Sequence, residues 1–172
     1  RDITNEKRSA NELRKLAHRD PLTGLPNRLM LEQQLGAAIP RARTQDQRLA
    51  LGFIDVNRFK SINDQYGHAT GDSVLLEVAK RLRSAVRNSD MVARLGGDEF
   101  VVLFEGLSRS NAVEAEAQRI SEQLFTALTP PMQLQEGEFH IGASLGVAVF
   151  PDHAVTMDKL IHAADLAMYT AK

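Results

Sequence analysis

The pattern of apolar and polar residues along the chain predicts strands that alternate with helices. Residues 49–54 form an unbroken apolar run of strand length, which is typical of a central strand buried on both faces. Residues 140–150 alternate with a period of two, which predicts a further strand. Elsewhere apolar residues recur every three or four positions, and this spacing predicts helices over residues 27–39, 58–66, 71–86, 110–128 and 156–171.

Single residues mark where several of these helices are expected to begin or end. Asn27 can cap the first helix, because its side chain accepts a hydrogen bond from a free N–H of the first turn, and Pro40 is expected to end that helix. Gly67 is expected to stop the second helix, and Gly71-Asp72 to open the third.

A hairpin that carries two adjacent acids lies near the middle of the chain. Gly96-Gly97 predicts its turn, because glycine reaches positive φ without a Cβ clash. Asp98 and Glu99 lie directly on this turn, where their like charges repel. A bound divalent cation is one way to neutralise them, and a solvated polar turn is the alternative. The turn joins two strand-like runs, residues 92–95 and 100–104.

The order of these elements predicts an α/β domain with helices on both faces of a central sheet. The sheet is expected to be mixed, because a hairpin adds an antiparallel pair to it. Residues 1–19 are charged and carry a weak heptad pattern, which predicts a linker helix. This helix could pair with a second copy of the chain, or lie on the domain surface as an amphipathic helix.

The composition excludes several classes of function. The chain has 172 residues and a net charge of −1, which argues against a partner that is a nucleic-acid polymer. It has no cysteine, so disulfides and cysteine-ligated metal sites are excluded. No apolar run approaches a membrane span, and the N-terminus does not resemble a signal peptide. The first residue is not methionine, and both ends are expected to be cuts in a longer protein.

Three carboxylates are candidates for a metal site. Asp55 follows the central apolar strand, where ligand and metal contacts are common in α/β sheets, and it could lie beside Asp98 and Glu99. Carboxylates without cysteine or a histidine motif favour a hard cation such as Mg²⁺. Two such ions would suit phosphoryl or nucleotidyl transfer.

Three further polar residues fit a nucleotide. Lys60 could steady phosphate charge, while an Asp72 carboxylate and an Asn63 amide could together read a guanine edge. Each has a plain alternative: Asp72 could cap its helix, Asn63 could cap or turn the chain, and Lys60 could be solvated.

Four ordered motifs resemble the GGDEF family of diguanylate cyclases. Residues 96–100 (GGDEF) are its signature, and the resemblance extends from Asp20 to Lys172. The other matching segments are residues 20–28 (DPLTGLPNR), 55–72 (DVNRFKSINDQYGHATGD) and 164–172 (ADLAMYTAK).

The resemblance implies a fold similar to class III nucleotidyl cyclases and polymerase palm domains. It implies condensation of two GTP into cyclic di-GMP with release of two pyrophosphates. Mg²⁺ or Mn²⁺ would be held by Asp55, the Val56 carbonyl, Asp98 and Glu99. Asp98 or Glu99 would help deprotonate the attacking 3′-hydroxyl, and the resemblance does not decide between them.

The resemblance also implies how GTP is held. Asn63 and Asp72 would read guanine, with Phe59 beside them. Lys60 would stabilise charge that develops on the phosphates, and Lys172 would reach the terminal phosphate. Each domain would bind one GTP, so a homodimer would be needed to complete the active site.

A product-inhibition site is implied by residues 87–90 (RNSD), which match the family's RxxD motif. Arg87 would take guanine or phosphate and Asp90 the guanine N–H edge; the alternative is an exposed ion pair. The chain departs from the family at Asn57, where many members have aspartate. It also stops at Lys172, where the family continues with a phosphate-binding arginine, so GTP affinity is expected to be lowered.

The resemblance also suggests the surroundings of the domain. Residues 1–19 would be the signalling helix that follows a PAS-type sensor, and residues 20–172 the GGDEF domain. The expected location is the cytoplasm, either as a soluble protein or as the cytoplasmic part of a membrane-anchored receptor. The alternative function is a catalytically silent GTP-binding module that controls an adjacent EAL phosphodiesterase domain.

Overall fold

The structure of the chain is a computed structural model, and it describes residues 9–10 and 17–171. The predicted linker helix and its PAS-type start lie almost entirely outside the described residues, as does Lys172. The elements follow one another as α2 (Arg28–Thr44), β1 (Arg48–Asn57), α3 (Phe59–Tyr66), α4 (His68–Ala85), β2 (Met91–Gly96), β3 (Glu99–Leu107), α5 (Val113–Leu128), β4 (Met132–Leu134), β5 (Gly137–Phe139), β6 (Gly142–Phe150) and α6 (Met157–Thr170).

Four strands form one sheet in the order β2-β3-β1-β6, and each neighbouring pair is antiparallel. The α/β class and the hairpin are confirmed, but the expectation of a mixed sheet is corrected to an antiparallel one. The reason is topological. The strands β1 and β2 run in the same direction and are joined through α3 and α4, but β3 folds back between them. The strand β1 separates β3 from β6 in the same way, which gives a split βαββαβ arrangement.

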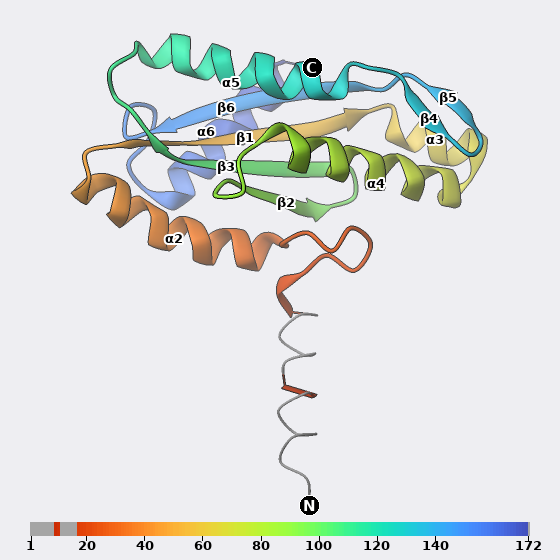
Figure 1. The fold of residues 1–172 in the computed structure, drawn as a ribbon, viewed down its shortest axis with the longest axis horizontal. Coiled ribbons are helices and arrows are strands. Elements are labelled where there is room, and N and C mark those ends of the chain that lie inside the picture. The colour runs from red at the N-terminus through yellow and green to blue at the C-terminus, as the bar shows by residue number, and fades with distance from the viewer. Residues whose placement is uncertain (1–8, 11–16, 172) are drawn as a thin grey trace, which may run out of the picture.

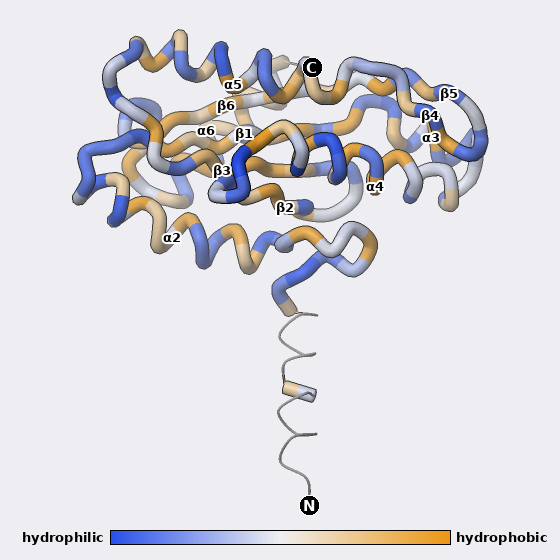
Figure 2. The backbone as a smooth tube through the Cα atoms, viewed as in Figure 1, coloured by the Kyte–Doolittle hydropathy of each residue, from blue (hydrophilic) through white to orange (hydrophobic). Residues whose placement is uncertain are grey.

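Helices cover both faces of the sheet, with α4 and α5 on one face and α2 and α6 on the other (Figure 1). Successive residues of β1 therefore enter different cores: Ile54 belongs to the core that includes Leu124 of α5, and Phe53 to the core that includes Leu35 of α2. This explains the unbroken apolar run of the central strand. Figure 2 shows the apolar residues gathered along the strands, while the helices alternate apolar and polar residues.

The helix α2 continues through Pro40, so the expectation that this proline ends the helix is wrong. A proline inside a helix leaves the carbonyl four residues before it without its N–H donor. Pro40 and Gly36 both lie on the exposed side of α2, where water can solvate that carbonyl. Ala42, beyond the proline, is buried, so the apolar face favours continuation of the helix to Thr44.

The helix α4 begins at His68 rather than at Gly71-Asp72. Gly67 ends α3 and precedes α4 directly, and its φ of 94° allows the chain to turn from one helix into the next without a linker. Thr70, in the first turn of α4, is buried. Asp72 therefore lies in the second turn of the helix, and the alternative that it caps the helix is excluded.

The hairpin of β4 and β5 was not predicted, because strands of three residues are too short to display a period of two. Its two apolar partners, Met132 and Phe139, are buried against the α4–α5 core. Phe139 meets Tyr66 of α3 edge to face, with ring centroids 5.0 Å apart. No helix in the described part of the chain has the length and apolar character needed to cross a lipid bilayer.

Candidate active site at the hairpin turn

The turn between β2 and β3 depends on its two glycines. Gly96 has a φ of 143° and Gly97 a φ of 52°, so both positions use backbone conformations that side chains rarely adopt. The strand register is irregular between Arg94 and Gly96, next to the turn. The predicted hairpin is confirmed, with Asp98 in the turn and Glu99 as the first residue of β3.

Arg94 is hydrogen-bonded to the backbone of this turn. Its guanidinium donates to the carbonyl oxygen of Gly97 from Nε at 3.0 Å and from Nη2 at 2.8 Å. Its Nη1 pairs with Oδ1 of Asp20 at 2.8 Å, while Oδ2 of Asp20 accepts from the backbone and the hydroxyl of Thr23. The loop that follows the linker segment is therefore tied through one ion pair to the backbone beside Asp98.

Asp55 lies at the far end of the central strand, beside the turn. Its Cα is in register with Glu99 on β3 and with Ser144 on β6, and the residue is buried. The next residue, Val56, donates its backbone N–H to the carbonyl oxygen of Asp98 at 3.1 Å. The split topology of the sheet thus brings the turn onto the end of β1, as the sequence predicted for Asp55 and Asp98.

The carboxyl groups of Asp55 and Asp98 are in contact, and this raises the pKa of Asp98 to about 6. Burial is the largest cause, followed by the hydrogen bond with Asp55 and by the negative charge of Asp55; the charge of Glu99 adds to the rise. A carboxyl pair that shares a proton near neutral pH is a site at which a cation can replace that proton.

Glu99 does not complete a three-carboxylate cluster. Among the residues that the structure describes, no group of three or more histidine, cysteine, aspartate or glutamate side chains is placed to hold one metal ion. The structure brings Asp55 and Asp98 together, and the role of Glu99 as a third metal ligand stays a prediction; its charge acts on Asp98.

The raised pKa predicts how stability depends on pH. The folded protein holds a proton on Asp98 that an unfolded chain, with the ordinary value of 3.8, has already released. The stabilising contribution is therefore fully present below pH 3.8 and is lost as the pH rises through about 6. Thermal melts of the wild type and of Asp98→Asn, in buffer with a chelator, should converge at low pH. Above pH 6 the variant should melt at the higher temperature, and equal melting temperatures throughout would contradict this prediction.

A cavity of about 550 Å³ opens at the carboxyl pair. Lys60 and Phe59 come to it from the start of α3, which directly follows β1. Ala171 comes to it from the end of α6, so the last described residue of the chain lies at this cavity. The full lining is Asp55, Val56, Asn57, Arg58, Phe59, Lys60, Asp98, Ala143, Ser144 and Ala171. The described site residues at this cavity therefore offer both negative charge and a lysine.

Asn63 and Asp72 lie beside this cavity rather than in its lining, at the place where α3 meets α4. Asn63 is half-buried on α3, and its Oδ1 atom is buried without a hydrogen-bond partner among the described residues. Asp72 is exposed on α4. Phe59 reaches both places, because it lines the cavity and its Cζ lies beside the backbone of Gly71. Phe59 therefore lies between the predicted guanine-binding residues, Asn63 and Asp72, and the cavity that Lys60 lines.

Asn57, the departure from the family pattern, is held by its neighbours on β6. Its Oδ1 accepts from the hydroxyl of Ser144 at 2.9 Å, and its amide lies against Gly142. Asn57 forms the exposed end of β1 and lines the cavity, so it adds a neutral amide where an aspartate would add a third charge.

Arg87 and Asp90 lie at the opposite end of β2 from the hairpin turn, roughly 20 Å away along the strand. Asp90 is buried, and its carboxylate accepts from the backbone N–H of Arg87 at 3.0 Å and from its guanidinium at 3.2 and 3.3 Å. The Arg87 side chain is 58% exposed. The alternative to a product site was an exposed ion pair between Arg87 and Asp90. That ion pair is present, although Asp90 is buried.

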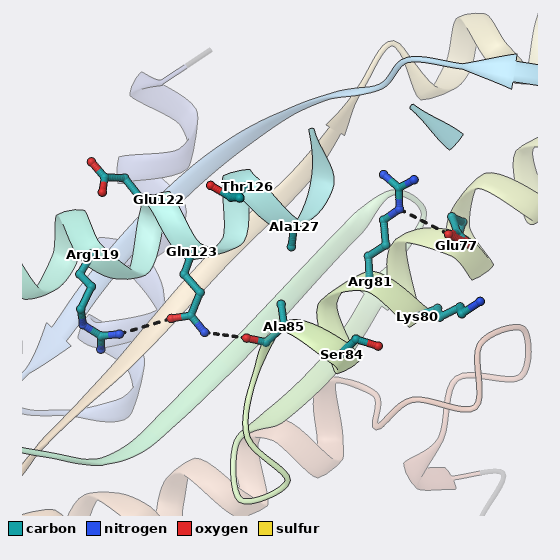
Figure 3. Close-up of a pocket in the computed structure, with 10 residues that line it drawn as sticks. All are labelled: Glu77, Lys80, Arg81, Ser84, Ala85, Arg119, Glu122, Gln123, Thr126 and Ala127. Atoms are coloured by element: carbon teal, nitrogen blue, oxygen red, sulfur yellow. Dashed lines mark hydrogen bonds and ion pairs between the residues drawn. The ribbon is translucent and has the colours of Figure 1, made fainter. Parts of the chain in front are cut away.

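A separate cavity of about 670 Å³ lies between α4 and α5 (Figure 3), and none of the predicted site residues lines it. Gln123 on α5 donates to the carbonyl oxygen of Ala85 on α4 at 2.7 Å and accepts from Arg119 at 3.3 Å. The bond from Gln123 to Ala85 joins the two helices, which indicates a role in helix packing.

The family model described as "Diguanylate cyclase, GGDEF domain" matches residues 17–172. "Diguanylate cyclase TpbB" from Pseudomonas aeruginosa is 45% identical over 157 residues, which is 91% of this chain and 35% of that protein. "Bifunctional diguanylate cyclase/cyclic di-GMP phosphodiesterase MucR" from the same species is 44% identical over 169 residues, which is 98% of this chain and 24% of that protein. The chain therefore spans about a third or less of the length of these relatives.

Solved structures show the same fold. The GGDEF domain of PA1120 (TpbB or YfiN) from Pseudomonas aeruginosa is 45% identical, with a TM-score of 0.81 and coverage of 90% of this chain and 88% of that one. The coiled coil and GGDEF domain of DgcB from Caulobacter crescentus, in complex with c-di-GMP, is 25% identical, with a TM-score of 0.81 and coverage of 98% and 87%.

Proposed function

The chain belongs to the GGDEF family of diguanylate cyclase domains, and from this premise we propose that it condenses two GTP molecules into cyclic di-GMP and two pyrophosphates. The main observation that supports this proposal is the contact between the carboxyl groups of Asp55 and Asp98 at the turn of the signature hairpin, which raises the pKa of Asp98. In the reaction the 3′-oxygen of each GTP attacks the α-phosphorus of the other. Each attack forms one phosphodiester bond and breaks one bond to pyrophosphate.

The residues at the turn fit a divalent cation. Two carboxyl groups in contact share a proton that a cation can replace, and oxygen atoms without sulfur or imidazole suit Mg²⁺ or Mn²⁺. Asp55, Asp98 and the Val56 carbonyl would hold the ion. When bound, it would neutralise phosphate charge and lower the pKa of the attacking hydroxyl.

The protein's own groups would position GTP and manage its charge. Lys60, at the same cavity, would stabilise the negative charge that develops on the phosphates during attack. Asp98 or Glu99 would accept the proton of the 3′-hydroxyl. Lys172 follows Ala171, which lines the cavity, and would reach the terminal phosphate.

The active site would be formed by two copies of the chain. A single copy offers one carboxyl pair and one Asn63–Asp72 pair, which suits one GTP. The second GTP must therefore come from a facing domain, and catalysis would consist largely of positioning the two nucleotides. In this proposal residues 20–172 would form the catalytic domain, and residues 1–19 would act as the linker that brings two domains together.

The proposal is tested by incubating the purified protein with GTP and Mg²⁺ and separating the products by chromatography with mass detection. Cyclic di-GMP and pyrophosphate in a ratio of one to two are expected. Binding of GTP without any product, in protein shown to be dimeric, would refute the cyclase activity.

A second candidate function is a GTP-binding module that does not turn over and that controls a phosphodiesterase domain on the same chain. It is favoured by the resemblance to MucR, whose name joins both activities and of which this chain spans 24%. GTP binding without turnover, together with a GTP-dependent change in a downstream phosphodiesterase activity, would support it.

Product inhibition through Arg87 is expected if the exposed guanidinium binds cyclic di-GMP. Arg87→Ala should raise the concentration of cyclic di-GMP needed for half inhibition by about tenfold or more, because it removes a bidentate contact to guanine or phosphate. The affinity for GTP should not change, since Arg87 and the hairpin turn lie at opposite ends of β2. Initial rates measured with added product would check this, and unchanged inhibition would exclude a role for Arg87.

A further inference from the structure

Gly71 is the point at which α3 and α4 touch. A Cβ atom built on Gly71 would lie 1.8 Å from Oδ1 of Asn63, 2.9 Å from its Cγ and 3.3 Å from Cζ of Phe59. Real Cβ atoms essentially never approach another heavy atom within 3.0 Å. Gly71 lies inside α4, between its ends at His68 and Ala85. The need for glycine here is therefore a need for space and not for an unusual φ.

Two features at this contact reduce the stability of the fold. Oδ1 of Asn63 is buried against Gly71 and has no hydrogen-bond partner among the described residues, which is unfavourable for a polar atom. Glycine in the interior of a helix is also less favourable than alanine. An apolar contact between α3 and α4 would avoid both costs, so the arrangement points to a requirement other than stability.

We infer that Gly71 is a positioning residue for base recognition, an inference that rests on the proposed function. Asn63 on α3 and Asp72 on α4 are the two proposed base readers, and Asp72 directly follows Gly71. The contact at Gly71 therefore sets the separation between the amide and the carboxylate. A methyl group there would displace the Asn63 amide by roughly 1 Å or more, and shifts of that size can cost two orders of magnitude in a positioned reaction.

The displaced amide should affect guanine more than adenine. A carboxylate accepts from the N1–H and N2–H₂ groups of guanine, and the amide contacts O6 or N3. Adenine presents no N2 amine and carries a donor in place of O6, so it cannot make the same set of contacts. Loss of the correct separation should therefore reduce the preference for guanine instead of weakening all nucleotides equally.

The test compares Gly71→Ala with Gly36→Ala, the same substitution at another helical glycine. A Cβ on Gly36 meets nothing within 4 Å, so that variant should bind as the wild type does. Calorimetric titration with 3′-deoxy-GTP and 3′-deoxy-ATP, which lack the attacking hydroxyl, measures affinity without turnover. Gly71→Ala should lose tenfold or more in affinity for the guanine nucleotide and less than twofold for the adenine nucleotide. In steady-state assays with GTP its KM should rise more than its kcat falls.

A double variant shows whether Gly71 acts through Asn63. On an Asn63→Ala background, Gly71→Ala should cost less than a further twofold, because the amide that it displaces is gone. If Gly71→Ala alone does not fold, the double variant should fold, since the closest clash has been removed. Additive losses, a misfolded double variant, or equal losses for both nucleotides would overturn the inference. Wild-type protein that binds neither nucleotide would instead refute the proposed function itself.

Discussion

Replacement of Asp98 with alanine is expected to lower cyclic di-GMP synthesis by about a thousandfold or more, because it removes both a proposed metal ligand and a candidate base. The same variant should melt at a higher temperature than the wild type at pH 8 without divalent cations. The reason is that it removes a carboxyl whose pKa is raised by burial and by contact with Asp55. Activity and stability are thus expected to change in opposite directions, which a merely misfolded protein could not do.

Two measurements complete this comparison. Mg²⁺ should raise the melting temperature of the wild type, since the proposed metal site exists only in the folded state, and should have little effect on Asp98→Ala. Asp158→Ala removes an exposed aspartate at the start of α6 and should leave both activity and the response to Mg²⁺ unchanged. Full activity of Asp98→Ala would contradict the assignment of the site.

Arg48→Ala is expected to destabilise the domain by about 2–3 kcal/mol, because it removes the hydrogen bonds that the buried Arg48 guanidinium donates to charged and carbonyl oxygen atoms. Arg48 is the first residue of β1, and its side chain is 7% exposed. Its guanidinium donates to both carboxylate oxygens of Asp152, at 3.0 and 3.1 Å, and to the carbonyl oxygen of Asn111 at 2.6 Å. One side chain thus joins the central strand to the turn after β6 and to the loop before α5.

An exposed pair of the same type provides the control. Arg109 and Asp46 lie 2.6 Å apart, but their side chains are 46% and 81% exposed, so Arg109→Ala should cost less than about 1 kcal/mol. Chemical denaturation of both variants measures the difference. Arg48 also lowers the pKa of Asp152, chiefly through their hydrogen bond, so the contribution of the pair is lost as the pH falls. Equal costs for the two variants would show that burial of Arg48 does not matter.

Local patterns in the sequence were enough to predict most elements of the fold. The apolar run of β1 identified a strand between two cores, and Asn27 does cap α2 by accepting from the N–H of Met30 at 3.1 Å. The strand order was beyond such patterns, because whether β3 inserts between β1 and β2 depends on pairing between distant segments. For this reason the sheet was expected to be mixed and is antiparallel.

The part of the candidate site formed by acidic residues at the ends of predicted strands could be predicted from the sequence. Asp55 and Asp98 were expected to meet, and they do. The ion pair between Asp20 and Arg94 was not foreseeable, since 74 positions separate the two residues and neither lies in a pattern that names a partner. The contact at Gly71 could not be predicted either. The sequence does not show whether a glycine inside a helix is required because a larger side chain would clash, or is only accepted there.

The dependence of specific activity on protein concentration tests the central claim most directly. If two facing domains are needed to join two GTP molecules, cyclic di-GMP formed per protein molecule per minute should rise with concentration and reach a plateau once the protein is dimeric. GTP and Mg²⁺ are held constant, and dimerisation is followed in parallel by sedimentation. Specific activity that is the same at every concentration, in protein that sediments as a monomer, would contradict the account, as would bound GTP with no product in the dimer.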